Sequence, residues 1–229
     1  MKKYQVLILL GGLGTRVKKF TRKIPKCLIK FNKKPFLYYQ LKYLKNRGID
    51  NVLLSSYYFS NTIKLYVKKN IDFINVKIVN DGKLLGTGGA ILNSLKYMEK
   101  KFYIIYGDSY LNFDLNKIKN KKNLATMAIY KNKNLYDKSN ISLKKSNKIR
   151  YYKNIENKKL NYIDYGVSYV DKSIFNKRLN KRFELSELYD MISKKNMLSK
   201  YIVNKRFYEI GSYNGIKDFK NYIDINEID

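Results

Sequence analysis

Residues 6–16 read Val-Leu-Ile-Leu-Leu-Gly-Gly-Leu-Gly-Thr-Arg. The unbroken apolar run at the start is typical of a parallel strand that is buried on both faces. The glycines that follow allow backbone N–H groups to approach phosphate oxygens closely, and Arg16 can bind the same oxygens with charge-assisted hydrogen bonds. The stretch is neither a Walker A loop, which needs Gly-Lys-Ser/Thr, nor a complete Gly-x-Gly-x-x-Gly fingerprint. It therefore predicts a strand that ends at a phosphate-binding turn.

Strands and helices alternate in the first half of the chain. After the strand at 6–10, the apolar spacing predicts strands at 52–56, 76–79 and 102–106, and helices at 35–46, 62–69 and 90–98. A second glycine loop, 86–89, precedes the last of these helices. The alternation predicts an α/β fold with a Rossmann-like, doubly wound sheet that is mixed but mostly parallel.

The second half is less regular. Strands are expected at 125–130 and 166–170, helices at 185–194 and 215–222, and a surface hairpin within the Lys- and Asn-rich stretch 132–161. No internal repeat or linker interrupts the 229 residues, of which 45% are hydrophobic, so we expect a single domain over residues 1–229.

The composition excludes several classes of chemistry. The chain has no histidine, so it lacks a Ser-His or Cys-His couple, His-ligated zinc and a histidine that carries a nucleotidyl group. The single cysteine, Cys27, cannot form an intramolecular disulfide, which fits a cytoplasmic protein. The net charge is +30, but the lysines are spread through almost every segment. Such a surface suits polyanionic small molecules rather than nucleic acid.

Further motifs follow the first glycine turn in order. They are Pro25-Lys26, Leu85-Gly86-Thr87-Gly88-Gly89-Ala90, Tyr106-Gly107-Asp108-Ser109, Asp164-Tyr165-Gly166 and Tyr208-Glu209-Ile210-Gly211-Ser212. Together they resemble the sugar-phosphate nucleotidyltransferase family, and most of all its short heptose 1-phosphate guanylyltransferases. The resemblance implies the nucleotide-diphospho-sugar transferase type of fold. It also implies direct transfer from a nucleoside triphosphate to a sugar 1-phosphate, with GTP and manno-heptose 1-phosphate as the favoured pair.

The resemblance assigns roles residue by residue. The nucleotide would contact Gly11, Gly12, Leu13, Gly14, Thr15, Arg16, Gly86, Thr87, Gly88, Gly89 and Asp108. Arg16, Lys26 and Asp108 would be catalytic, and Asp108 with Glu209 would hold Mg²⁺, which prefers such hard oxygen ligands. The sugar phosphate would contact Lys153, Asp164, Tyr165, Gly166 and Glu184.

Some of these positions depart from the family pattern. Glu209 stands where the family has aspartate, and Asp164 stands where asparagine is frequent. Of the family's Glu-Lys-Pro motif only Lys153 remains. Glu184 can equally be a carboxylate in the first turn of a helix.

Other functions stay open at this point. A cytidylyltransferase acting on phosphocholine or another small phosphate ester is the alternative within the fold, and a nucleic-acid-binding module is the alternative from another class. A dinucleotide-dependent dehydrogenase is disfavoured because Val17 replaces the third fingerprint glycine and Ser56 ends the second strand instead of an acidic residue. We expect a nucleoside triphosphate and a sugar 1-phosphate as partners, no nucleic acid and no membrane, and leave a homodimer open.

Overall fold

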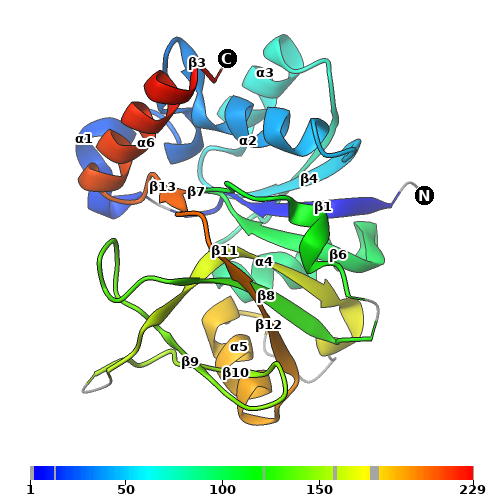
Figure 1. Cartoon of the computed structure of the whole chain (residues 1–229). Helices are drawn as coiled ribbons and strands as arrows, with labels where there is room; N and C mark the ends of the chain where they lie inside the picture. The colour runs from blue at the N-terminus through cyan, green and yellow to red at the C-terminus, as the bar shows by residue number, and fades with distance from the viewer. Residues whose placement is uncertain (1–2, 13, 121, 157–158, 176–180, 229) are drawn as a thin grey trace.

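The central strand of the sheet is β1 (Tyr4–Leu9). It pairs in parallel with β4 (Asn51–Ser56) on one side and with β6 (Met98–Tyr106) on the other. Beyond β4, β5 (Asn75–Asn80) adds a further parallel strand. The computed structural model describes residues 3–12, 14–120, 122–156, 159–175 and 181–228. Figure 1 shows β1 running through the middle of the molecule. The three parallel pairings confirm the predicted parallel half of the sheet.

The other half of the sheet is mixed. Next to β6 lies the antiparallel strand β11 (Tyr162–Asp171), followed by β8 (Ala125–Lys131), which is antiparallel to β11. The outer strand β12 (Leu198–Val203), which the sequence did not predict, is parallel to β8. The expected hairpin is formed by β9 (Ile141–Leu143) and β10 (Ile149–Tyr151). The prediction of a doubly wound, mixed but mostly parallel sheet is therefore confirmed.

Helices cover both faces of the sheet. One face carries α2 (Phe36–Lys45), α3 (Ser60–Asn70) and α6 (Tyr213–Asn226), and the other carries α4 (Gly86–Ser94) and α5 (Leu185–Lys194). Side chains of a strand alternate between faces, so every second residue of β1 joins each of the two cores. Both cores need apolar partners from this strand. This explains why its sequence is a continuous apolar run rather than an alternating one.

Short elements complete the chain. They are α1 (Lys18–Thr21), β2 (Lys30–Phe31), β3 (Lys34–Pro35), β7 (Ser109–Tyr110) and β13 (Tyr208–Glu209), with single 3-10 turns at Thr15–Val17, Lys26–Leu28, Leu95–Tyr97, Leu115–Ile118 and Lys172–Ile174. Within the described part of the chain, no helix has both the length and the apolar character needed to cross a membrane.

The glycine loop predicted at 86–89 is wrong, because these residues form the first turn of α4. The N–H groups of Gly88 and Gly89 donate to the carbonyl of Phe183 at 3.0 and 3.3 Å, so the segment before α5 satisfies them. A Cβ on Gly88 would lie 2.2 Å from the ring of Phe183. Glycine is required here for close packing between two distant segments, which local sequence does not reveal.

Helix α6 is attached to the sheet by an aromatic cluster. Phe219 is completely buried, and its ring centroid lies 4.9 to 5.9 Å from those of Phe31, Phe36, Tyr39 and Tyr110. Aromatic pairs at this spacing add to the free energy of burial.

We expect Phe219→Ala to lower the free energy of unfolding by about 3–5 kcal/mol, because it opens a cavity in this cluster. Urea unfolding followed by circular dichroism measures the change. Ile225→Ala on the same helix is the matched control, since its side chain is 81% exposed. Equal urea midpoints for the two variants would contradict the structural role of the cluster.

Candidate active site

A cleft of about 480 Å³ opens where the parallel strands end. Its wall includes Gly11 after β1, Ser55 near the end of β4, Asp81 after β5 and Asp108 after β6. In open α/β sheets, ligands bind outside the carboxyl ends of the strands, where neighbouring connections diverge. The cleft therefore lies where ligands usually bind in folds of this type.

Most of the residues assigned from sequence line this cleft. They are Gly11, Gly12, Arg16, Lys26, Gly86, Thr87, Asp108, Asp164, Tyr165, Gly166, Glu184 and Glu209. Gly14, Thr15, Gly88, Gly89 and Lys153 do not belong to its described lining, and Leu13 lies outside the described residues. Gly14 has a φ of +64° and shapes the turn, with its carbonyl accepting from the Thr21 hydroxyl.

A close ion pair lies in the cleft. The Nζ atom of Lys26 is 2.6 Å from Oδ2 of Asp108, and the two side chains are 17% and 24% exposed. Pro25, in extended conformation, leads into the 3-10 turn that begins at Lys26. The sequence singled out both residues, and the structure brings their side chains into contact although they are far apart along the chain.

The turn that carries Asp108 is held from two sides. The Gly107 N–H donates to the carbonyl of Leu9 at 3.0 Å, and a Cβ on Gly107 would lie 2.4 Å from that oxygen. The buried amide of Gln40 on α2 donates to the carbonyl of Ser109 at 2.8 Å. Asp108 is thereby fixed against the end of β1 by contacts that involve no ligand.

Glu209 and Arg16 converge on Asp108. In the β7–β13 pair Glu209 lies opposite Ser109. A Cβ on Gly211 would lie 2.8 Å from Oε2 of Glu209 and 3.0 Å from both Oδ2 of Asp108 and Nη2 of Arg16, so the three charged groups surround this glycine. Burial, with a further contribution from the Asp108 carboxylate, raises the pKa of Glu209 above its usual value.

The carboxylates of Asp108 and Glu209 are suited to a hard divalent cation whose remaining ligands include phosphate oxygens of a bound substrate. Asp108 and Glu209 supply oxygen ligands, although the Glu209 oxygens also accept from the Gly211 N–H and the Ser212 hydroxyl. Among the described residues no group of three or more metal-binding side chains is present. Mg²⁺ is commonly bound by one or two carboxylates together with substrate phosphates, so two carboxylates are compatible with such a cation.

Asp164 lines the cleft at an irregularity of β11. The strand shifts register between Asp164 and Ser168, and Gly166 within the shift has a φ of +90°. The Gly166 N–H donates to Oδ1 of Asp164 at 2.8 Å, and the Tyr106 hydroxyl also hydrogen bonds to this carboxyl. Burial nevertheless raises the pKa of Asp164 to about 7. The bulge turns a polar group toward the cleft from a strand that is otherwise largely buried.

Tyr165 contributes to the cleft differently from Asp164. Its side chain is 1% exposed and packs against Phe113 and Phe207, with ring centroids 5.1 and 5.8 Å away. Its hydroxyl donates to the carbonyl of Arg206 at 3.0 Å. The side chain of Tyr165 is therefore anchored in the core next to the cleft.

Glu184 connects the start of α5 to the start of α4 by hydrogen bonds. It is the residue before α5, and its Oε2 accepts from the N–H and the hydroxyl of Thr87 at 3.1 and 2.7 Å. The Leu185 N–H in turn donates to the Thr87 hydroxyl at 2.8 Å. Glu184 lines the cleft and, at the same time, satisfies groups in the first turn of α4.

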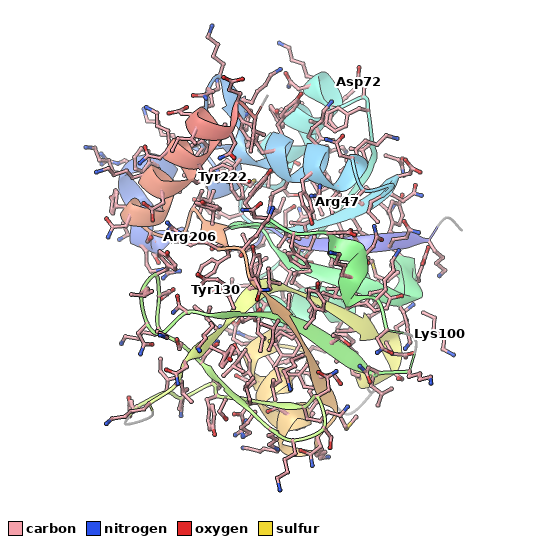
Figure 2. All side chains as sticks on the ribbon, viewed as in Figure 1. Arg47, Asp72, Lys100, Tyr130, Arg206 and Tyr222 are labelled. Carbon is pink, nitrogen blue, oxygen red and sulfur yellow. The ribbon has the colours of Figure 1, made fainter. Side chains whose placement is uncertain are left out.

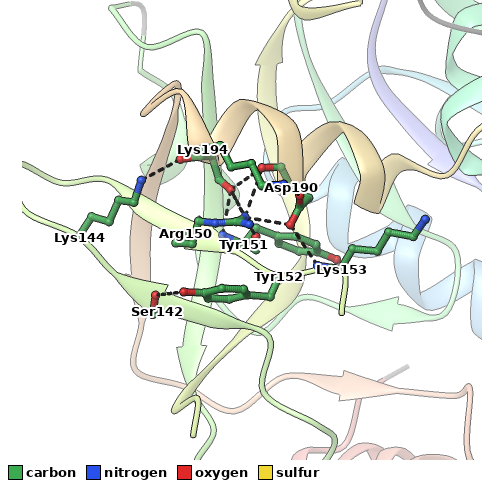
Figure 3. A network of polar contacts seen from close by, with 9 residues as sticks. Ser142, Lys144, Arg150, Tyr151, Tyr152, Lys153, Asp190 and Lys194 are labelled. Atoms are coloured by element: carbon green, nitrogen blue, oxygen red, sulfur yellow. Dashed lines mark hydrogen bonds and ion pairs between the residues drawn. The ribbon is translucent and has the colours of Figure 1, made fainter. Parts of the chain in front are cut away.

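The structure does not bring Lys153 into the cleft. Its Nζ atom lies 2.8 Å from Oε1 of Glu187, and both side chains are nearly half exposed. Just before it, the Arg150–Asp190 ion pair of 2.9 Å binds the end of β10 to α5 (Figure 3). The Arg150–Asp190 pair holds this segment against α5. Lys153 therefore pairs with Glu187 of the same helix and does not line the cleft.

Several polar residues of the cleft were missed in the sequence. Among them are Asp81, Lys83, Lys138, Asn140 and Tyr151. Asp81 directly follows β5 and lies two residues after the strand predicted at 76–79, so a ligand site at strand ends could have indicated it. The other residues carried no signal, because lysine, asparagine and tyrosine are abundant throughout the chain.

Comparison with known proteins agrees with this geometry. The family model described as nucleotidyl transferase matches residues 5–209. The D-glycero-alpha-D-manno-heptose 1-phosphate guanylyltransferase of Campylobacter jejuni is 33% identical over 209 residues, covering 90% of this chain and 94% of that protein. The choline-phosphate cytidylyltransferase of Streptococcus pneumoniae is 30% identical, but over only 47% of this chain and 45% of its own length.

Among solved structures, HddC from Yersinia pseudotuberculosis complexed with GMP-PN superposes with a TM-score of 0.81 at 26% identity. The superposition covers 96% of this chain and 99% of HddC. The fold and the charged cleft define a nucleotidyl-transferring enzyme, and this chain belongs to the nucleotidyl transferase family. Within that family it is similar over nearly its whole length to the Campylobacter heptose 1-phosphate guanylyltransferase.

We expect Asp108→Asn to reduce turnover on the order of a hundredfold or more, because it removes the charge that pairs with Lys26 and that can hold a divalent cation. Pyrophosphate release at saturating Mg²⁺ measures the loss, and circular dichroism checks the fold. Asp72→Asn, at an exposed position labelled in Figure 2, is the control. Turnover within a few-fold of the wild-type value would refute the role of Asp108.

Proposed function

We propose that this chain transfers the guanylyl group of GTP to a manno-heptose 1-phosphate and releases pyrophosphate, with Mg²⁺ as its cation. The observation that carries the proposal is that one cleft is lined both by the glycine turn with Arg16, which suits a triphosphate, and by Asp164 with its polar neighbours, which suit a sugar. We call these two sets of lining residues the nucleotide half and the sugar half of the cleft. The Lys26–Asp108 pair lies in the same cleft. The similarity to the Campylobacter enzyme over 90% of the chain supports this choice of substrates.

The chemistry requires two anions to approach each other. A phosphate oxygen of the acceptor attacks the α-phosphorus of the nucleotide, so positioning and charge neutralisation dominate catalysis. Arg16 and the backbone of the glycine turn would bind the outer phosphates, and Lys26 would face the reacting phosphate. Bound by Asp108 and Glu209, Mg²⁺ would supply the further positive charge.

A covalent nucleotidyl-enzyme is disfavoured. The chain has no histidine, and Cys27 is buried with its pKa raised to about 12 by that burial. A thiol in this state is a poor nucleophile because the thiolate is the reactive form. Direct in-line displacement needs no such group.

Asp81 supports guanine as the base. Its carboxylate accepts from the Ser55 hydroxyl at 2.8 Å and from the Asn93 amide at 3.1 Å, and it lines the cleft beside Gly11. Burial raises the pKa of Asp81, whereas these two hydrogen bonds favour its charged form. A carboxylate is an acceptor only, and guanine presents N1–H and an amino group as adjacent donors.

A pyrophosphate-release screen tests the proposed function. Four nucleoside triphosphates are combined with a panel of sugar 1-phosphates and with choline phosphate. GTP with manno-heptose 1-phosphate is expected to give the highest kcat/KM. A maximum for CTP with choline phosphate would replace the proposal with the cytidylyltransferase alternative.

We expect Asp81→Asn to lower kcat/KM for GTP on the order of tenfold or more, because a charged hydrogen bond contributes about 1.5–3 kcal/mol. Activity with UTP and CTP, whose pyrimidines lack guanine's pair of donors, is expected to change much less. The ratio of the specificity constants is the measurement, and Asp72→Asn serves again as control. A uniform loss with every nucleotide would argue against base recognition by Asp81.

A further inference from the structure

The phosphate of the acceptor needs a cation of its own, and this inference rests on the proposed function. The resemblance offered Lys153, but the structure pairs that lysine with Glu187 outside the cleft lining. Of the described residues, the cationic side chains that do line the cleft are Arg16, Lys26, Lys83 and Lys138. The first two are already assigned to the nucleotide, so the choice lies between Lys83 and Lys138.

Lys83 lies close in sequence to residues assigned to the nucleotide, two residues after Asp81 and three before Gly86, on the connection between β5 and α4. Lys138 lies instead on the loop 132–140 between β8 and β9, whose Asn140 accepts from the Asp164 N–H.

The loop 132–140 has a defined shape. The buried Asn132 side chain donates to the carbonyl of Asp137 at 2.6 Å and to the Ser139 hydroxyl at 3.2 Å, and it accepts from the Tyr136 N–H at 3.3 Å. Arg206, labelled in Figure 2, stacks over the Tyr136 ring at 3.8 Å from its centroid. The backbone at Lys138 is therefore held in place before any ligand binds.

Two contacts bracket Lys138 along this loop. Its predecessor Asp137 reaches Nη1 of Arg16 with Oδ2 at 4.0 Å, on the nucleotide side. Two residues later, Oδ1 of Asn140 accepts from the Asp164 N–H at 3.1 Å, on the acceptor side. Consecutive Cα atoms are about 3.8 Å apart. Lys138 therefore lies between Asp137, which contacts Arg16, and Asn140, which contacts Asp164.

The ammonium group of Lys138 is available for a ligand. The ion pairs of the described residues engage Lys26, Lys45, Lys153 and Lys194 but not Lys138. A lysine ammonium binds phosphate as a flexible point charge with three donors.

We propose that Lys138 binds the phosphate of the sugar 1-phosphate and so holds the attacking oxygen next to the nucleotide. This lysine takes the role that the sequence motif suggested for Lys153. The charge of the acceptor is then neutralised from the loop 132–140, whose Asp137 also contacts Arg16 of the glycine turn.

Steady-state kinetics of Lys138→Gln with GTP and manno-heptose 1-phosphate test this proposal. We expect the KM for the sugar phosphate to rise on the order of tenfold or more, because a charged hydrogen bond is lost, while the KM for GTP changes less than about twofold. Lys138→Arg keeps the charge and is expected to restore part of the affinity. Lys133→Gln removes the same charge from an exposed position on the same loop outside the cleft lining, and its kinetics should match the wild type.

Three results would overturn the assignment. The first is an active wild type together with an unchanged KM for the sugar phosphate in Lys138→Gln. The second is a rise in the KM for GTP alone, which would assign Lys138 to the nucleotide. A raised acceptor KM in Lys153→Gln but not in Lys138→Gln would return the role to Lys153. If the wild type released no pyrophosphate with any acceptor of the panel, the proposed function would fail first, and this inference with it.

Discussion

The position of β1 is the constraint on which the rest of the structure depends. The strand is hydrogen-bonded to β4 and β6 along both edges and is covered by helices on both faces. Parallel neighbours need crossover connections, so their carboxyl ends all reach the same edge of the sheet. The turn after β1, the end of β4 and the residues after β5 and β6 consequently meet in one cleft. The chemistry available to these groups depends on this convergence of strand ends.

The charges in the cleft contrast with those of the whole chain. The protein carries a net charge of +30, yet Asp81, Asp108, Asp164 and Glu209 line the cleft. Burial raises the pKa of three of them, namely Asp81, Asp164 and Glu209. Placing carboxylates in such surroundings costs free energy, and partners that donate hydrogen bonds or carry positive charge compensate for it. Carboxylates are also hydrogen-bond acceptors that can bind a metal ion or the donor groups of a base or a sugar hydroxyl, whereas the side chains of lysine and arginine act only as donors.

Contacts between distant segments fix the walls of the cleft. Thr87 and Glu184 bond to each other, and the carbonyl of Phe183 accepts from the N–H groups that begin α4. At α5 itself, the Arg150–Asp190 pair binds the β9–β10 hairpin to the helix. These bonds connect segments that are far apart in the sequence and hold the lining residues Thr87 and Glu184 together.

The sequence by itself determined the parallel half of the sheet and the centre of the site. An apolar run followed by glycines is a local pattern, and the ordered motifs singled out Arg16, Lys26, Asp108 and Glu209, which lie close together in the structure. These features could be predicted because each depends on a few contiguous residues at the end of a strand. The bounds of α5 were likewise predicted from its amphipathic spacing.

Only the tertiary structure decided which lysine lines the cleft, why position 88 has no room for a side chain, and where β12 lies. Lys153 pairs with Glu187, whereas Lys138 is carried to the cleft by a loop that Asn132 and Arg206 hold. In a chain with 48 lysines and arginines, side-chain type alone cannot distinguish a ligand-facing cation from a surface one. The distinction depends on packing between segments that are far apart in sequence, and no local pattern records that packing.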